Sequence, residues 1–157
     1  MKIMFWNTHR NNSINSYIIE LVEHNEIDVL VLAEYTSDTS ELNNLLKQSN
    51  KRLFKWNTYG CERIQMWGNY VDVTPAEQNK YFSIQIINKK YIICGIHMYS
   101  DLNGEHYDER ISLAEEIKCS IQQVRNQLNS ENVIVIGDMN ESPYDKSCLS
   151  AKGFHAL

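Results

Sequence analysis

Residues 133–140 read VIVIGDMN, and this stretch indicates the fold more clearly than any other part of the sequence. Four alternating Val and Ile residues are typical of a buried strand, because β-branched side chains pack well on a pleated surface. Gly137, Asp138 and Asn140 follow, so a carboxyl and an amide group lie two residues apart. An ordinary turn is one interpretation, but polar side chains directly after a buried strand are also typical of a binding site at the edge of a sheet.

Three further apolar runs end in a polar residue of the same kind. Residues 2–6 end at Asn7, residues 27–33 at Glu34 and residues 91–96 at His97. Each has a simpler explanation when taken alone: Asn7 suits a turn, Glu34 a first solvated position and His97 a hydrogen-bonded, half-buried histidine. In open α/β sheets, however, ligands bind outside the strand ends, where side chains on rigid supports converge. The four strand ends together therefore favour one shared site.

The residue types at these strand ends favour hydrolysis of a phosphoester. Carboxylate and amide oxygens are hard ligands, which suit Mg²⁺ or Mn²⁺ better than zinc. Such a metal neutralises charge on a phosphate oxygen and helps the leaving group depart. A histidine can hydrogen-bond the phosphate or transfer a proton near neutral pH. The sequence has no Gly-rich phosphate loop and no GxSxG motif, so nucleotide-dependent transfer and serine hydrolysis find no support.

The rest of the pattern predicts an α/β fold, a layered α/β sandwich with mixed sheets, in one domain over residues 1–157. A helix over 13–24, with Asn12 or Ser13 as its N-cap, connects the first two strands as in a parallel strand–helix–strand unit. The remaining expected elements are a short helix over 40–48, one or two strands within 53–73, a hairpin of 81–87 and 91–97 that turns at residues 88–90, and a long helix over 108–128.

Composition excludes several classes of protein. With 157 residues, 43% hydrophobic and 22% charged, the chain is expected to fold around an ordinary core. No apolar run is long enough for a membrane span, and no signal peptide is visible at the N-terminus. The four cysteines are widely spread without a CxxC pair, which favours reduced thiols in the cytoplasm over a zinc site or a disulfide framework. The net charge of -5 argues against binding nucleic acid by bulk charge alone.

Four segments resemble motifs of the endonuclease/exonuclease/phosphatase superfamily, the DNase-like metal-dependent phosphohydrolases. They are IMFWN at 3–7, DVLVLAE at 28–34, ICGIHM at 93–98 and VIVIGDMN at 133–140. They resemble the superfamily's Trp-Asn, DVLxLQE, THL and GDFN strands in order and relative placement, and Ser142-Pro143 continues the last one. Ala33 stands where Gln is common, and Ile96 stands in place of Thr.

The resemblance implies a role for each strand-end residue. Glu34 would bind the divalent metal, Mg²⁺ or Mn²⁺, with Asn7 beside it. Asp138 would orient or activate the attacking water, and Asn140 would hold the phosphate. His97 would contact the phosphate or assist at the leaving group.

One motif of the superfamily has no counterpart in this sequence. The superfamily closes with Ser-Asp-His, whereas His155 follows Asn140 too soon and has no preceding Asp. The resemblance therefore predicts that the C-terminal part of the fold is missing, by truncation, cleavage or natural loss. Unpaired strand edges would then make the chain associate with itself or with a missing C-terminal segment.

The function that follows is metal-dependent hydrolysis of a phosphoester by a nuclease-like phosphodiesterase, with DNA, RNA, a lipid headgroup and an inositol phosphate as open substrates. The alternative is a binding or remnant domain that keeps the fold without turnover. Two further features have structural explanations that we prefer. Arg110 could reach a phosphate but suits a solvated helix face, and the aromatic residues Trp56, Tyr59, Trp67 and Tyr70 could stack on bases but suit a core or a self-packed loop.

Overall fold

The computed structural model describes residues 1–100, 107–142, 144–149 and 154. Along the chain the elements are β1 (Ile3–Asn7), α1 (Asn15–His24), β2 (Val29–Ala33), α2 (Thr39–Gln48), β3 (Phe54–Lys55), β4 (Ile64–Gly68), β5 (Val73–Gln78), β6 (Phe82–Ile87), β7 (Tyr91–His97), α3 (Tyr107–Leu128), β8 (Val133–Asp138) and α4 (Lys146–Leu149).

The strands form two mixed sheets, as the sequence predicts. The first sheet has the order β1-β2-β4-β3 and the second the order β5-β6-β7-β8. Each sheet contains one parallel pair, β1 with β2 and β7 with β8, and its other pairs are antiparallel. Parallel strands end at the same edge of a sheet, so each sheet brings two strand ends together.

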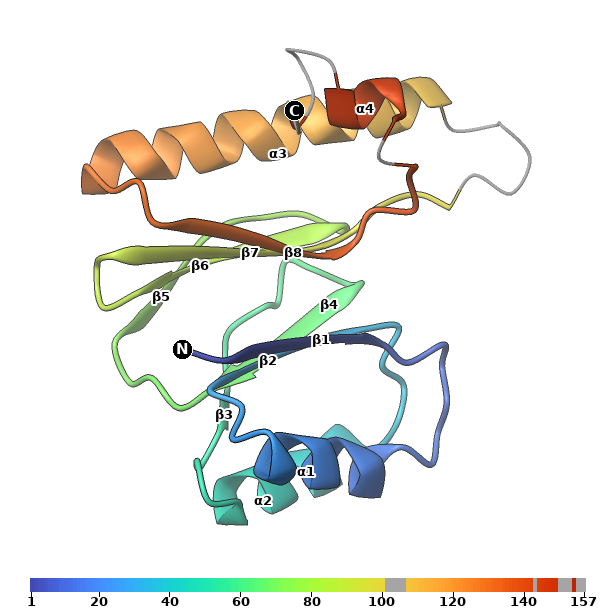
Figure 1. Ribbon diagram of the computed structural model, residues 1–157, viewed down its shortest axis with the longest axis vertical. Coiled ribbons are helices and arrows are strands. Elements are labelled where there is room, and N and C mark those ends of the chain that lie inside the picture. The colour runs from blue at the N-terminus through green and yellow to red at the C-terminus, as the bar shows by residue number, and fades with distance from the viewer. Residues whose placement is uncertain (101–106, 143, 150–153, 155–157) are drawn as a thin grey trace.

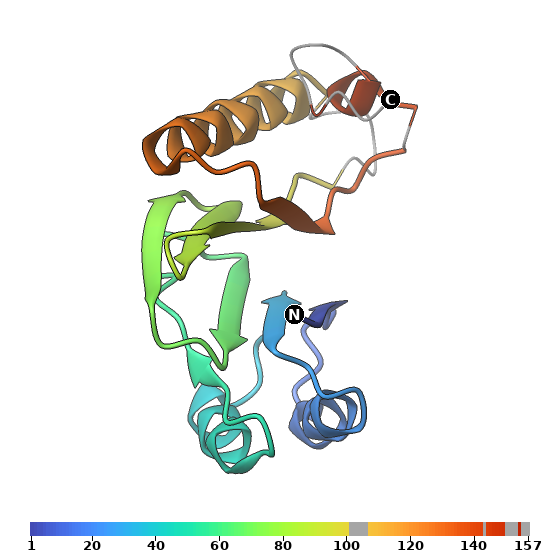
Figure 2. The same cartoon turned by 60° about the vertical axis from the view of Figure 1, so that its left-hand side comes forward.

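The two sheets pack face to face between two layers of helices (Figure 1). Helices α1 and α2 cover the outer face of the first sheet through a cluster that includes Ile18, Leu30 and Leu46. Helix α3 covers the outer face of the second sheet through Leu113, Ile117 and their neighbours. A third apolar cluster lies between the sheets, and the layers are seen edge-on in Figure 2. The predicted layered α/β sandwich is therefore confirmed.

The two strands that the sequence describes as buried differ in the structure. All five residues of β2 are buried, as expected for an inner strand with both faces covered. Strand β8, by contrast, is an edge strand of the described sheet, and each of its six residues is only half-buried. The expectation that residues 133–136 form a buried strand was therefore wrong. A run of Val and Ile fits a pleated sheet equally well at the centre and at an edge, so composition alone does not separate the two.

The start of α1 also differs from the prediction. Ile14 occupies the N-cap position and makes no side-chain capping hydrogen bond, so the expected caps Asn12 and Ser13 were wrong. Instead, the Asn11 side chain accepts a hydrogen bond from the Ser13 backbone N–H at 2.9 Å. This local turn satisfies the backbone before the helix begins.

The region over 53–73 holds two strands, β3 and β4, in agreement with the one or two expected, and β5 begins at its last residue and extends to Gln78. Strand β5 was not predicted: it contains Pro75 and a register irregularity between Pro75 and Gln78, both typical of an edge strand. The hairpin of β6 and β7 was predicted correctly. Asn88 and Lys89 have φ values of 51° and 52°, as a tight hairpin turn requires.

Two of the four aromatic residues singled out in the sequence belong to the core. Trp56 and Trp67 are buried, Trp56 between the sheets and Trp67 against the helices of the first sheet. Tyr59 is 93% exposed and therefore packs against little. The preferred structural interpretation is confirmed for both tryptophans. Within the described ranges, no helix is long and apolar enough to cross a membrane.

Candidate functional site

The two parallel pairs place four of the five predicted site residues at matching positions. In the first sheet Asn7 is in register with Ala33, the residue before Glu34. In the second sheet His97 is in register with Asp138. The two sheets meet at this end, where Asn7 Nδ2 donates a hydrogen bond to Asp138 Oδ2 at 2.9 Å across 131 residues of sequence. The strand ends therefore converge, as the sequence predicts for a shared site.

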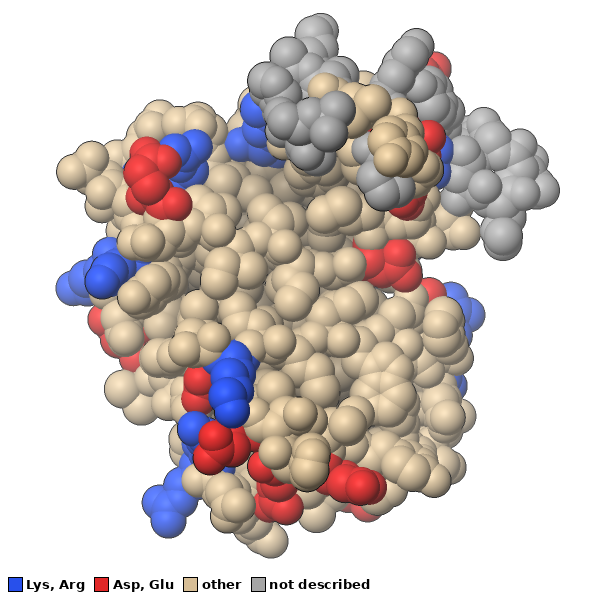
Figure 3. Space-filling model, viewed as in Figure 1, with Lys and Arg blue, Asp and Glu red and all other residues tan. Residues whose placement is uncertain are grey.

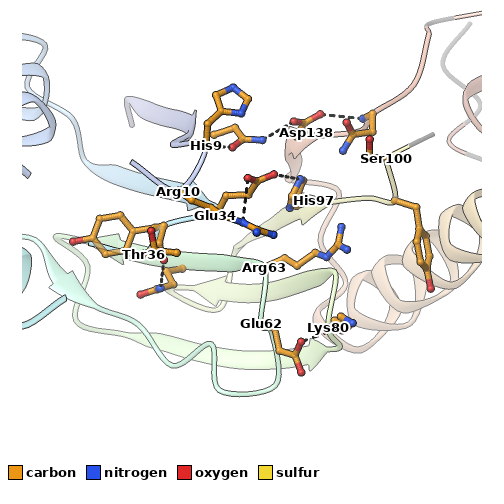
Figure 4. Close-up of a pocket in the computed structure, with 15 residues that line it drawn as sticks. His9, Arg10, Glu34, Thr36, Glu62, Arg63, Lys80, His97, Ser100 and Asp138 are labelled. Carbon is orange, nitrogen blue, oxygen red and sulfur yellow. Dashed lines mark hydrogen bonds and ion pairs between the residues drawn. The ribbon is translucent and has the colours of Figure 1, made fainter. Parts of the chain in front are cut away.

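A cavity of about 830 Å³ opens where the strand ends meet. Asn7, Glu34, His97, Asp138 and Asn140 all line it. In Figure 4 the labelled side chains follow one another from Asp138 through Glu34 and His97 to Arg63 and then to the Glu62–Lys80 pair. The five residues predicted from four separate segments thus face one space.

The backbone of Glu34 is held by hydrogen bonds, and its carboxylate lines the cavity. It has a φ of 51°, and its carbonyl oxygen accepts hydrogen bonds from the Thr8 hydroxyl at 2.8 Å and the Arg10 backbone N–H at 3.2 Å. Its carboxylate oxygens lie 3.4 Å from His97 Nε2 and 3.8 Å from Arg10 Nε. The side chain is 28% exposed, so the carboxylate is accessible to a ligand in the cavity.

Asp138 is held through both of its carboxylate oxygens. Oδ2 accepts the hydrogen bond from Asn7, and Oδ1 accepts one from the Asn140 backbone N–H at 3.0 Å. Asn140 has a φ of 49°, and its Nδ2 donates to the Met98 carbonyl at 3.1 Å. Each carboxylate oxygen of Asp138 retains a lone pair, so the group can still accept a hydrogen bond from a bound water.

His97 is 5% exposed, and its surroundings disfavour the protonated ring. Burial lowers the pKa of His97 below its usual value, and the positive charge of Arg63 lowers it further, whereas Asp138 and Glu34 act in the opposite direction. The imidazole is consequently neutral at neutral pH. Its Nδ1 is buried without a hydrogen-bond partner in the described part of the chain.

The expected solvated face for Arg110 was wrong. This side chain is buried at 4% exposure and reaches from α3 to the segment after β8. Its NH1 donates to the Asn140 carbonyl at 2.9 Å, and its Nε lies 3.0 Å from Glu141 Oε1. Arg110, on α3, therefore holds the backbone of Asn140 in place.

Several cavity residues were missed by the sequence analysis, among them Arg10, Arg63, Lys80 and Tyr99. Arg63 directly precedes β4, which runs antiparallel to β2, so the start of β4 lies at the same end as Glu34. That pairing was the signal that could have identified it, but the strands within 53–73 were not resolved from the sequence. Pro143 and His155, named above for the last motif and the missing one, lie outside the described residues.

The oxygen donors at the site fit a hard divalent cation. Glu34 offers an accessible carboxylate, and the Asn7 amide oxygen accepts one hydrogen bond, from the His9 backbone N–H at 3.0 Å, which leaves a lone pair. Within the described ranges, no group of three or more His, Cys, Asp and Glu could enclose a metal. One or two protein oxygens completed by water and substrate are typical of Mg²⁺, whereas zinc sites use more protein ligands.

Comparison with solved structures identifies the architecture. A truncated TDP2 from Caenorhabditis elegans superposes with a TM-score of 0.67 at 17% identity, covering 91% of this chain and 63% of that chain. An AP endonuclease from Archaeoglobus fulgidus gives 0.59 at 14% identity, over 91% and 59% of the two chains. TDP2 from D. rerio, in complex with a single strand DNA product, gives 0.59 at 14% identity, over 92% and 62%.

No protein-family model and no curated protein sequence matches the chain. The chain spans less than two thirds of the length of each of these three structures. The structural likeness confirms the DNase-like fold that the four sequence motifs indicate.

Proposed function

Because the chain has the DNase-like fold of the endonuclease/exonuclease/phosphatase superfamily, we propose that its site hydrolyses a phosphodiester with a divalent metal and a water nucleophile. The observation that carries this proposal is the convergence of Asn7, Glu34, His97, Asp138 and Asn140 on one cavity. They come from the ends of four strands that are far apart in the sequence. A fold can support many functions, whereas these side chains point to one chemistry.

Glu34 and Asn7 are the residues that would hold the cation. The Glu34 carboxylate is accessible, and its two neighbours Arg10 and His97 lie at distances longer than a strong hydrogen bond, so a cation can displace these contacts. When bound, Mg²⁺ or Mn²⁺ supplies charge neutralisation at a phosphate oxygen.

In this proposal Asp138 orients the attacking water. Its two oxygens are anchored by Asn7 and by the Asn140 backbone, so the direction of its remaining lone pairs is fixed before substrate binds. An in-line displacement at phosphorus depends on such fixed geometry. Asp138 therefore positions water in this proposal and takes up a proton as the water attacks.

Asn140 and His97 would hold the phosphate. The Asn140 amide uses one N–H on the Met98 carbonyl and has a second N–H available for a phosphate oxygen. The neutral His97 ring can donate a hydrogen bond to a phosphate oxygen through one nitrogen. Because the ring carries no positive charge, it does not repel the nearby metal ion. Arg110 keeps the Asn140 backbone in place through its hydrogen bond to that carbonyl.

Nucleic acid is the substrate class that we favour. Two structural relatives support it, because one is an AP endonuclease and another was solved with a single strand DNA product. The face in Figure 3 shows Lys and Arg scattered beside acidic groups, with no broad basic surface. Recognition would therefore depend on groups inside the cavity more than on bulk charge.

The proposal is tested by hydrolysis of bis(p-nitrophenyl) phosphate and of plasmid DNA with Mg²⁺ or Mn²⁺. Asp138→Asn is expected to lower the turnover rate about 10²–10³-fold with little change in thermal stability, as for loss of one preorganised polar group. Glu23→Gln, on the exposed face of α1, is the control and should keep full activity. Full activity of a folded Asp138→Asn protein would refute the assignment.

A binding domain without turnover is the second candidate. It is favoured by the lack, within the described residues, of a cluster of three His, Cys, Asp or Glu. Calorimetry with Mn²⁺ tests whether the site binds a metal at all. The wild-type protein should bind Mn²⁺ weakly, and the Glu34→Ala protein should not bind it. Metal binding without hydrolysis of either substrate would select the binding domain, and equal binding by both proteins would exclude Glu34 as a ligand.

A further inference from the structure

Arg63 lies in the cavity on the far side of His97 from Asp138 and is held in one orientation (Figure 4). Its guanidinium carbon lies 4.6 Å from the centre of the Tyr81 ring and 5.9 Å from that of Tyr99. The two tyrosine rings pack on each other at 4.3 Å. Arg63 NH1 also donates a hydrogen bond to the Met98 carbonyl at 3.1 Å. A guanidinium fixed by ring stacking and a backbone acceptor loses little entropy when it binds an anion.

Within the part of the chain that the structure describes, Arg63 differs from Arg10 and Lys80 of the same cavity in having no carboxylate partner. Arg10 lies 3.8 Å from Glu34, and Lys80 lies 4.0 Å from Glu62. Among the described residues, none forms an ion pair with Arg63. Its side chain is half-buried, and most of its five N–H donors are left for a ligand. A positioned, uncompensated guanidinium in a cavity is an anion-binding group.

The Met98 carbonyl shows how close Arg63 lies to Asn140, the residue that would hold the phosphate to be hydrolysed. It accepts hydrogen bonds both from Arg63 NH1 and from Asn140 Nδ2. Arg63 and Asn140 therefore approach the same oxygen, and an anion on Arg63 would lie next to the phosphate that Asn140 holds. Lys80, whose ammonium lies 5.7 Å from the Tyr81 ring, is on the same side but is paired with Glu62, so Arg63 is the group that would bind the anion.

We propose that Arg63, stacked on Tyr81, binds a second phosphate of the substrate, adjacent to the phosphate that is hydrolysed. This inference rests on the proposed function and narrows its substrate class to molecules with phosphates on neighbouring positions, such as a nucleic acid strand. A phosphodiester with one anionic group, such as a choline-type lipid headgroup, would leave Arg63 without a partner. The cavity, at about 830 Å³, has room for more than one phosphate.

The test compares substrates that differ by one phosphate. The dinucleotide TpT carries only the bond to be cleaved, whereas pTpT and TpTp carry a second phosphate on one side or the other. The wild-type protein is expected to cleave one of the two-phosphate substrates with a kcat/KM about 10- to 100-fold above that for TpT, the range of a hydrogen-bonded charge. Arg63→Gln should lower kcat/KM for the two-phosphate substrate about 10- to 100-fold more than it lowers kcat/KM for TpT, so that the preference disappears.

Two variants control the interpretation. Arg63→Lys keeps the charge but loses the planar fork, so it should retain an intermediate preference. Arg52→Gln removes an exposed arginine outside the cavity lining and should retain the full preference. If Arg63→Gln lowers TpT and the two-phosphate substrates by the same factor, Arg63 only supports the Met98 carbonyl, and the inference is wrong.

A binding measurement separates failure of this inference from failure of the proposed function. The wild-type protein should bind thymidine 3′,5′-bisphosphate more tightly than thymidine 5′-phosphate. The Arg63→Gln protein should bind the two nucleotides with equal affinity. Both results are expected whether or not any substrate is cleaved. A bisphosphate preference without hydrolysis would refute catalysis and keep the anion site. Hydrolysis of TpT without any bisphosphate preference would keep catalysis and refute the anion site.

Discussion

The site residues that follow inner strands are held differently from those that follow edge strands. Glu34 directly follows the inner strand β2 and His97 ends the inner strand β7, and their positions depend on buried backbone and packing. Asn7 and Asp138 end the edge strands β1 and β8, whose residues are all half-buried, and Asn140 comes two residues after β8. Asp138 accepts hydrogen bonds from Asn7 at 2.9 Å and from the Asn140 backbone at 3.0 Å, and the Asn140 side chain donates to the Met98 carbonyl at 3.1 Å. Where burial cannot fix an edge, hydrogen bonds across the sandwich do so.

The support of Asp138 differs from the buried strand that residues 133–136 indicate in the sequence, because β8 is at an edge. The structure provides rigidity through Asn7, the Met98 carbonyl and Arg110 instead. Substitutions on the edge strands and on the inner strands should therefore have different effects.

Gly137→Ala should be the most damaging single change to the edge half. Gly137 has a φ of 156°, and an added Cβ would lie 1.9 Å from the Ile96 carbonyl oxygen of the neighbouring strand. Because the clash is with backbone, β7 and β8 would have to separate near Asp138. We expect a loss of roughly 3 kcal/mol in unfolding free energy, measured by urea denaturation, from backbone strain and overpacking together.

Gly95→Ala is the matched control on β7. Its Cβ would meet only side chains, with Ile64 Cγ2 at 3.0 Å and Val31 Cγ1 at 3.2 Å, and these can shift. The loss should therefore be clearly smaller than for Gly137→Ala. An equal loss in the two variants would show that β8 does not depend on the close backbone approach at Gly137.

Much of the fold was predictable from the sequence because its signals are local. Strand β2 is a continuous apolar run, the long helix α3 has a regular apolar stripe, and the β6–β7 turn has residues that accept a positive φ. Strands β3 and β5 were not predictable, since one has two residues and the other contains Pro75. Their placement depends on pairing with partners distant in sequence, which periodicity does not report.

The site was predictable in part for the same reason. Asn7, Glu34, His97 and Asp138 stand at strand ends, which the sequence marks by a change from apolar to polar residues. Arg63 and Arg110 were not recognised, because each lies in a segment where a charged residue is expected to be solvated. What makes them special is tertiary: Arg63 stacks on Tyr81, and Arg110 reaches the Asn140 carbonyl. The expected self-association through strand edges stays a prediction.

The inner and edge strands can be compared directly with the same substitution. Val31 on β2 is fully buried between the sheets, whereas Val135 on β8 is half-buried against α3. Val31→Ala should cost about 2 to 3 kcal/mol, from two buried methyl groups and the cavity they leave. Val135→Ala should cost about 1 kcal/mol, because an edge position buries less area. Chemical denaturation of both variants measures the difference, and equal losses would mean that β8 is as well covered as β2.

Asp28 directly precedes the inner strand β2 and connects it to the start of the edge strand β1, at the end opposite the site. Its Oδ2 accepts a hydrogen bond from the Lys2 backbone N–H at 2.8 Å, and its Oδ1 accepts one from Asn69 Nδ2 at 3.0 Å. Burial alone would raise the pKa of Asp28, but the Lys2 and Asn69 hydrogen bonds and the Lys51 charge outweigh it, so the pKa lies below its usual value. Asp28→Asn should therefore cost about 1 kcal/mol near pH 7, the usual net value of a hydrogen bond.

The pH dependence of this loss follows from the direction of the pKa shift. Because folding lowers the pKa, the unfolded chain binds more protons in acid, and stability increases with pH in that range. The contribution of Asp28 is present above the unfolded pKa of about 4 and is lost as the pH falls through the lower folded value. The wild-type and Asp28→Asn proteins should thus differ at pH 7 and converge below about pH 4, while Glu20→Gln, an exposed carboxyl on α1, should follow the wild type throughout. A difference that stays constant from pH 7 to pH 3 would show that the Asp28 side chain connects β1 and β2 by shape and not by charge.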